Sequence, residues 1–270
     1  MWLRSFAVLS LLAFAPVQDP APPAQPKDPV KERLEKSPRH HEWVEVKSGE
    51  RTLHCFVTYP EAKGKVAAVL VIHENKGLND WARAASDEFA EAGYIAIAPD
   101  LLSGAGPAGG KTDSFASSDA ATEAISKLDA TKVTADLNAA ADYVTKLEAC
   151  NGKLSVAGFC WGGGQSFAFA TARKGLKSAF VFYGSAPKEE AMAKIECPVY
   201  GFYGENDSRI TTTVAATTEA MKKLGKTFEP VTYEGAGHGF MRAGEAPDAS
   251  DPNKRARAEA WTRVKKLLGS

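Results

Sequence analysis

A cysteine between closely spaced glycines is the first pattern in this chain that could do chemistry. Cys160 lies in Gly158-Phe159-Cys160-Trp161-Gly162-Gly163, directly after an apolar run that begins at Leu154. Small residues two before and two after a nucleophile let the chain turn tightly from a strand into a helix, as in a nucleophile elbow. The helix start also directs backbone N–H groups at the sulfur, which favours a thiolate and a developing oxyanion. The alternative is a glycine-rich turn that holds a structural thiol.

An acid and a histidine follow this cysteine in the order of a catalytic triad. Asp207 ends the segment Tyr203-Gly204-Glu205-Asn206-Asp207, after an apolar run from Val199. His238 lies between glycines in Gly235-Ala236-Gly237-His238-Gly239-Phe240, after a strand expected to end near Tyr233. Taken singly, these residues fit a solvated turn and a structural histidine. Together, the order nucleophile, acid, histidine favours the α/β-hydrolase arrangement.

A fourth segment, His73-Glu74-Asn75-Lys76-Gly77, follows an apolar run that ends at Ile72. Hydrolases of this kind take one oxyanion N–H group from such a loop, so we expect the backbone N–H groups of Asn75 and Trp161 to hold the oxyanion. Glu74 places a charge directly beside an apolar strand, for which a surface salt bridge is the alternative.

All four segments must meet at one edge of a sheet, which requires parallel strands with their carboxyl ends together. Continuous apolar runs are typical of strands covered on both faces, and five occur: Val66–Ile72, Tyr94–Ala98, Leu154–Phe159, Ala179–Tyr183 and Val199–Tyr203. Helical periodicity is clearest in five segments between and after them: Asp80–Ala92, Thr131–Glu148, Gly163–Arg173, Thr211–Leu224 and Lys254–Leu268.

This alternation predicts one α/β domain over residues 41–270 with a doubly wound, mostly parallel sheet. The order of the cysteine, the acid and the histidine makes an α/β-hydrolase domain the expected form of it. Alternating residues in His41–Lys47 and Thr52–Tyr59, joined by Ser48-Gly49-Glu50, predict an antiparallel hairpin at its N-terminal end. Ser103–Ser118 is rich in Gly, Ser and Ala and is expected to be a loop over the edge of the sheet.

As a set, these motifs resemble the dienelactone hydrolase family from about Glu42 to the C-terminus. The resemblance rests on G-x-C-x-G-G, the glutamate after the oxyanion strand, Y-G-x-x-D, G-x-x-H-x-F, and Pro99-Asp100-Leu101 after another strand. Family members hydrolyse cyclic enol-lactones through a thioester and need no metal, so no cofactor is expected.

The resemblance also implies a role for each site residue. Cys160 is then the nucleophile, His238 the base, Asp207 its orienter, and Glu74 the carboxylate that pairs with the resting thiol.

Two arginines hold the substrate carboxylate in the best-understood members of the family. Arg242, four residues after His238, matches one of them. The other belongs shortly after P-D-L, where this chain reads Leu102-Ser103-Gly104-Ala105-Gly106. We therefore expect one cationic contact instead of two, with Lys76 or Lys111 as candidates for the missing charge.

The N-terminus predicts export to the periplasm or beyond. Residues 1–15 combine a positive start, an apolar run from Phe6 to Phe14 and the small-x-small pattern Ala13-Phe14-Ala15. The run is shorter than a membrane span of about 20 residues, so a signal peptide is the better interpretation and a hydrophobic tail the alternative. Residues 16–40 contain seven of the 15 prolines and predict an extended spacer.

Composition narrows the range of partners. An apolar fraction of 44% can form a core, and Lys plus Arg (33) balances Asp plus Glu (33). That balance excludes bulk attraction to nucleic acid or anionic lipid. We expect a small-molecule ester or lactone as the partner, a monomer, and no stable membrane insertion once the signal peptide is removed.

Two further groups of residues fit structural roles better than chemical ones. His40-His41-Glu42 could bind a metal but fits a solvated segment better. Four cysteines are too few for a disulfide scaffold, and a bridge needs Cα atoms within about 7 Å of each other. Cys55, Cys150 and Cys197 are therefore taken as structural.

The sequence thus predicts an exported hydrolase that cleaves an ester or lactone through a cysteine nucleophile. A general carboxylesterase acting on small esters is the nearest alternative. A non-catalytic, hydrolase-shaped binding protein of the cell envelope and a thiol redox protein are the others. The complete triad argues against a binding protein, and the lack of a C-x-x-C pair argues against a thiol redox protein.

Overall fold

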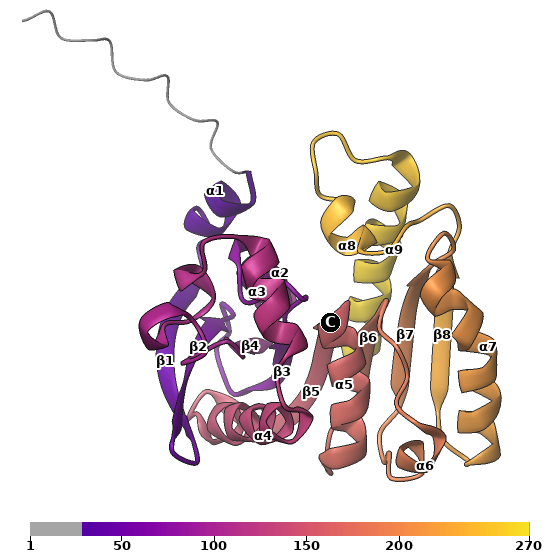
Figure 1. Cartoon of the computed structure of the whole chain (residues 1–270), viewed down its shortest axis with the longest axis horizontal. Helices are drawn as coiled ribbons and strands as arrows, with labels where there is room; N and C mark the ends of the chain where they lie inside the picture. The colour runs from indigo at the N-terminus through magenta and orange to yellow at the C-terminus, as the bar shows by residue number, and fades with distance from the viewer. Residues whose placement is uncertain (1–28, 270) are drawn as a thin grey trace, which may run out of the picture.

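Eight strands form one mixed sheet with the order β1-β2-β4-β3-β5-β6-β7-β8 in the computed structural model, which describes residues 29–269 (Figure 1). Strands β1 and β2 form an antiparallel hairpin, β2 pairs antiparallel with β4, and the other neighbours are parallel. The mostly parallel sheet and the hairpin are confirmed. The strands are β1 (His40–Ser48), β2 (Arg51–Tyr59), β3 (Val66–Ile72), β4 (Ile95–Pro99), β5 (Cys150–Phe159), β6 (Ala179–Phe182), β7 (Val199–Gly204) and β8 (Phe228–Tyr233).

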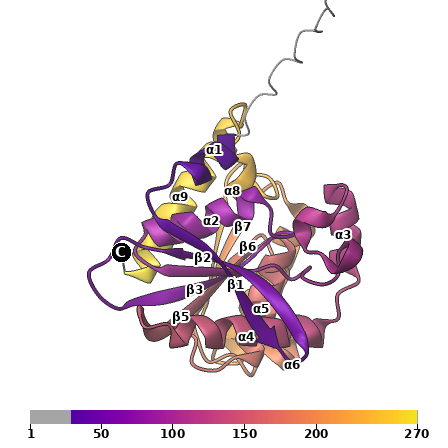
Figure 2. The same cartoon turned by 90° about the vertical axis from the view of Figure 1, so that its left-hand side faces the viewer.

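Helices cover both faces of this sheet, as Figure 2 shows for α2 and α9 on one side and α4 and α5 on the other. The α-helices are α1 (Pro29–Glu35), α2 (Asp80–Glu91), α3 (Ser118–Ser126), α4 (Ala130–Lys146), α5 (Trp161–Ala172), α6 (Glu189–Met192), α7 (Ser208–Lys223), α8 (Phe240–Ala243) and α9 (Asp251–Leu268). The sequence indicated α2, α4, α5, α7 and α9, with ends within about three residues.

Two hydrophobic cores result, one on each face. Alternate residues of a strand point to opposite faces, and in β3 Leu70 joins the core under α4, α5 and α7, while Val69 and Val71 join the core under α2 and α9. Because both cores are filled, β3 to β7 can be continuously apolar, which fits the runs in the sequence.

Helix α1 differs from the extended spacer that the prolines predict. Residues 16–28 of that spacer, like the signal peptide, lie outside the described residues. From Pro29 the chain is helical, because Val30 and Leu34 lie one turn apart and pack on the core of α2 and α9. Leu34 is only 7% exposed. Packed helical structure is therefore present about twelve residues before the expected boundary at residue 41.

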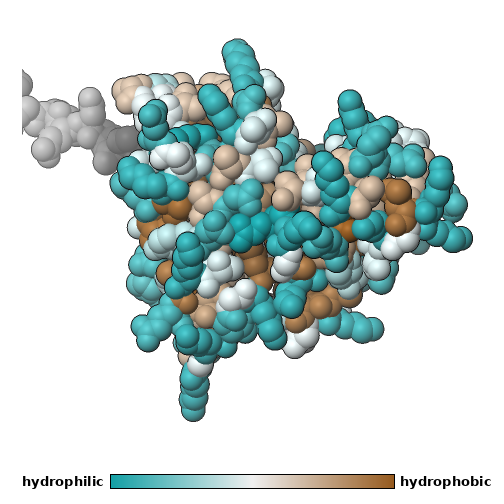
Figure 3. Space-filling model, turned by 90° about the horizontal axis from the view of Figure 1, so that it is seen from below, coloured by the Kyte–Doolittle hydropathy of each residue, from teal (hydrophilic) through white to brown (hydrophobic). Residues whose placement is uncertain are grey.

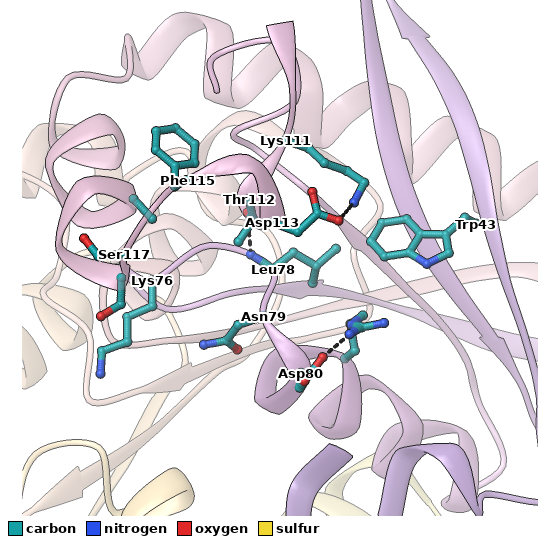
Figure 4. Close-up of a pocket in the computed structure, with 13 residues that line it drawn as sticks. Trp43, Lys76, Leu78, Asn79, Asp80, Lys111, Thr112, Asp113, Phe115 and Ser117 are labelled. Atoms are coloured by element: carbon teal, nitrogen blue, oxygen red, sulfur yellow. Dashed lines mark hydrogen bonds and ion pairs between the residues drawn. The ribbon is translucent and has the colours of Figure 1, made fainter. Parts of the chain in front are cut away.

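The segment 103–118 has short 3-10 turns at Pro107–Gly109 and Thr112–Ser114 and is fixed by a buried carboxylate. Asp100, at the end of β4, accepts hydrogen bonds from the backbone N–H groups of Leu102 and Thr112 and from the Thr112 hydroxyl. The same hydroxyl accepts the N–H of Leu78 at 3.0 Å, which Figure 4 shows as a dashed line. The segment is therefore tied to the loop that follows β3.

The face seen from below is largely polar. Figure 3 shows hydrophilic side chains over most of one face, with single apolar ones between them. Within residues 29–269, no helix combines the length and apolarity that crossing a membrane requires.

Candidate active site

Cys160 occupies a strained turn between β5 and α5. Its backbone has φ 56° and ψ −116°, a conformation that costs a non-glycine residue of order 1–3 kcal/mol. A Cβ atom on Gly158 would lie 1.9 Å from the carbonyl oxygen of Gly162, and one on Gly162 would lie 2.3 Å from that of His73. Only glycine fits at either position, so the spacing in the sequence is a steric requirement of this turn.

The structure brings Cys160, His238 and Asp207 into one hydrogen-bonded chain. His238 Nε2 lies 3.1 Å from Cys160 Sγ, and its Nδ1 lies 2.5 Å from Asp207 Oδ2. Asp207 is buried, and His238 is partly exposed at the site. The three residues follow β5, β7 and β8, so the parallel sheet alone brings them to one edge.

The partners of His238 favour its protonated form. The hydrogen bond to the Cys160 sulfur, with a smaller contribution from Asp207, raises the pKa of His238 to about 9, although burial opposes the shift. Only the imidazolium can donate from both nitrogens at once. The contacts of His238 with a sulfur and a carboxylate therefore fit the imidazolium form.

Tyr183, at the end of β6, holds this imidazole from the side. Its ring packs edge-on against His238 with centroids 5.1 Å apart, and its backbone has φ 41°. The hydroxyl donates to Glu74 Oε1 at 3.2 Å. Burial and the nearby Glu74 carboxylate raise the pKa of Tyr183 well above its usual range, so this hydroxyl keeps its proton. The sequence did not single out Tyr183; its place at the end of an apolar run and before Gly184 was the available signal.

Glu74 is buried but does not pair with the thiol as the resemblance implies. Its second oxygen accepts from Arg242 Nε at 2.9 Å, while the thiol bonds His238. Arg242 lines a different cavity from Cys160, together with Trp81 and residues of α1. The expected substrate contact of Arg242 therefore competes with an ion pair that neutralises a buried carboxylate.

His73 fixes the loop expected to hold the oxyanion. It is fully buried, and its Nδ1 lies 2.7 Å from the Glu74 carbonyl oxygen while Nε2 accepts the N–H of Leu101 at 3.3 Å. Burial lowers the pKa of His73, and these two bonds fit the neutral ring. The ring also stacks on Trp161 at 5.7 Å. His73 thereby connects the ends of β3 and β4 to the start of α5.

One cavity of about 580 Å³ contains Cys160 together with both residues expected at the oxyanion hole, Asn75 and Trp161. Apolar side chains from α3, α5 and the segment after β6 form much of the wall, including Ile125, Ala168 and Pro187. A cavity of this size and lining suits a small organic substrate.

The histidine pair and the other three cysteines have structural surroundings. His41 lies 2.7 Å from Asp87, which also binds Arg39. The remaining cysteines are buried and free: Cys55, Cys150 and Cys197. In the part of the chain that the structure describes, no group of three His, Cys, Asp or Glu side chains could hold a metal ion.

Comparison with known proteins gives consistent results. The sequence profile of the dienelactone hydrolase family matches residues 53–270. A protein of Methylorubrum extorquens named as a carboxymethylenebutenolidase is 28% identical over 209 residues, which cover 73% of this chain and 71% of the relative.

Two solved structures share the fold. A dienelactone hydrolase of Klebsiella pneumoniae superposes with a TM-score of 0.75 at 24% identity, covering 86% of this chain and 99% of that one. A dienelactone hydrolase-like promiscuous phosphotriesterase from metagenomic libraries gives 0.71 at 21% identity, covering 86% and 98%.

Proposed function

Since the chain belongs to the dienelactone hydrolase family and is a hydrolase of ester or lactone bonds, we propose that it works through a cysteine nucleophile, Cys160. The observation that carries the proposal is the unbroken chain from Cys160 Sγ through His238 to Asp207 at a strained elbow. A binding protein needs no such chain, because an imidazolium between a sulfur and a carboxylate contributes to nucleophilic attack and not to affinity.

In the reaction, the Cys160 sulfur attacks the carbonyl carbon of the substrate. The carbonyl oxygen takes up the negative charge, and the backbone N–H groups of Asn75 and Trp161 stabilise it. His238 gives its Nε2 proton to the leaving oxygen as the carbon–oxygen bond breaks, which leaves a thioester on Cys160.

Water completes the cycle. The now neutral His238 removes a proton from a water molecule, whose oxygen attacks the thioester carbonyl. The carbon–sulfur bond breaks, the acid is released, and the thiolate–imidazolium pair is restored. Asp207 keeps the imidazole in one orientation and stabilises its charge throughout.

The decisive variant is Cys160→Ala, assayed with 4-nitrophenyl acetate. We expect hydrolysis to fall to background while the melting temperature stays near that of the wild type, since the Cys160 side chain is partly exposed in the cavity. Cys197→Ala is the matched control and should keep full activity. Iodoacetamide should label Cys160 before the three buried thiols. Full activity of the Cys160→Ala variant would refute the mechanism.

A general carboxylesterase is the nearest alternative, and kcat/KM for acyl esters of graded chain length compared with lactones separates the two. A preference for lactones would support the narrower function. A steady rise with acyl length would support the broader one.

We also propose that the protein is exported, on the pattern of residues 1–15 alone. N-terminal sequencing of the protein recovered from a secreting bacterial host should begin after Ala15. Recovery from the cytoplasm with an intact N-terminus would contradict export.

A further inference from the structure

Arg209 is the one basic residue of the described chain that lines the cavity containing Cys160. No carboxylate from residues 29–269 lines this cavity, and its polar lining consists of neutral amide and hydroxyl groups beside the site residues. Arg209 is exposed, and within the same residues it has no hydrogen-bond or ion-pair partner. An unpaired arginine that shares a cavity with a nucleophile is open to an anion, which its planar fork binds with two hydrogen bonds.

The three cations expected from the sequence, Lys76, Lys111 and Arg242, line other cavities. Lys111 forms an ion pair with Asp113 and lies 4.7 Å from the ring centre of Trp43, in a separate cavity of about 390 Å³ (Figure 4). Lys76 lines that second cavity too. Arg242 is bound to Glu74 and lines a third. Of the four basic residues, only Arg209 lines the cavity of the thiol.

The sheet order fixes which side of the substrate Arg209 faces. Asn75 follows β3, whereas Arg209 is the second residue of α7 and follows β7; these strands lie on opposite sides of β5, which carries Cys160. Arg209 is also two residues from Asp207, which holds His238. The carbonyl oxygen is directed to the Asn75 side, and the leaving oxygen must be within reach of His238. The leaving group therefore extends towards α7.

We propose that Arg209 is a specificity-determining residue, which selects esters and lactones whose leaving-group part carries a negative charge such as a carboxylate. The inference rests on the proposed function, because it assumes that Cys160 and His238 act as described. The charge preference comes from α7 and not from the loop after P-D-L, where the resemblance placed the second arginine. The signal in the sequence was weak, since Arg209 belongs to no motif.

The test compares two acetate esters of the same shape, 4-acetoxybenzoate and its neutral amide, 4-acetoxybenzamide. Wild-type protein should show the higher kcat/KM with the anionic ester. Arg209→Gln should reduce that preference about tenfold, the size of one charge-assisted hydrogen bond, with the amide ester almost unaffected. Raising the ionic strength should weaken the preference of the wild type. Arg255→Gln, which removes an exposed arginine of α9, is the matched control and should behave as wild type.

A second measurement does not require ester hydrolysis. Anionic iodoacetate and neutral iodoacetamide both alkylate Cys160, and the ratio of their rates reports a cation in the cavity of the sulfur. Arg209→Gln should lower this ratio several-fold, and Arg255→Gln should not change it. If wild type hydrolyses neither ester but the ratio still falls, the proposed function fails and the anion contact stands. If Arg209→Gln keeps both the alkylation ratio and any ester preference of the wild type, the role of Arg209 is refuted.

Discussion

His238 makes a hydrogen bond from each ring nitrogen, and its charge depends on both. That Cys160, His238 and Asp207 meet could be predicted from the sequence, because each of them follows a strand of one parallel sheet. The pairing of Glu74 with Arg242 and Tyr183 was not predictable, since these residues lie 168 and 109 positions from Glu74 and no local pattern connects them.

At this scale we predict that His238 titrates with a midpoint near pH 9 in the folded wild type. The Cys160 sulfur is the main cause, so in Cys160→Ala the midpoint should fall towards the ordinary value of about 6.5. Following the imidazole Cε1–H signal by NMR across pH 5 to 10 measures both. Equal midpoints in the two proteins would show that the sulfur does not stabilise the imidazolium.

The same shift links stability to pH. A folded pKa above the unfolded value means that the stabilisation is complete below about pH 6.5 and is lost as the pH rises through about 9. Because the His238 side chain is one-third exposed, screening reduces the effect to the order of 1 kcal/mol. Urea unfolding of wild type and His238→Gln at pH 6 and pH 10 should therefore show the larger difference at pH 6.

At the scale of elements, the sequence predicted long elements well and short ones poorly. Helices α6 and α8 have four residues each, too few for a periodic pattern, and only their contacts stabilise them. Helix α3 is longer but directly follows the Gly, Ser and Ala segment that predicted a loop. The geometry of segment 103–118 depends on hydrogen bonds to buried Asp100. In the sequence, Asp100 is only a single acidic residue after a strand, and nothing there indicates these bonds.

The elbow gives a prediction about an element junction. Gly158→Ala places a methyl group 1.9 Å from the Gly162 carbonyl, so β5 and α5 must separate. We expect the variant to lose about 2–4 kcal/mol of unfolding free energy or to fail to fold. Gly152→Ala is the control, since its position near the start of β5 is open within 4 Å; at φ 80° it should cost about 1 kcal/mol. Chemical denaturation measures both, and equal losses would show that the elbow tolerates a side chain.

At the scale of the whole molecule, a partly buried charge network joins the N-terminal helix to the C-terminal one. Glu245, after α8, binds Arg33 of α1 at 2.5 Å and Arg257 of α9 at 3.1 Å. It also accepts from Trp81 Nε1 of α2 at 3.2 Å. Glu88 of α2 binds the same two arginines. Two carboxylates thus join three helices, α1, α2 and α9, with the segment after α8, whereas the sequence predicted a spacer where α1 lies.

Glu245→Gln tests whether this network stabilises the domain. The amide leaves Arg33 and Arg257 to share Glu88, so one positive charge becomes uncompensated in a partly buried place. We expect a loss of about 1–3 kcal/mol in unfolding free energy. Glu123→Gln, which breaks an exposed pair with Lys127 at the end of α3, should change the unfolding free energy much less, because solvent screens that pair. Activity of the folded protein should change little in either variant, because neither carboxylate lines the cavity of Cys160. Equal stability of the two variants would mean that apolar packing of Leu34 alone holds α1 in place.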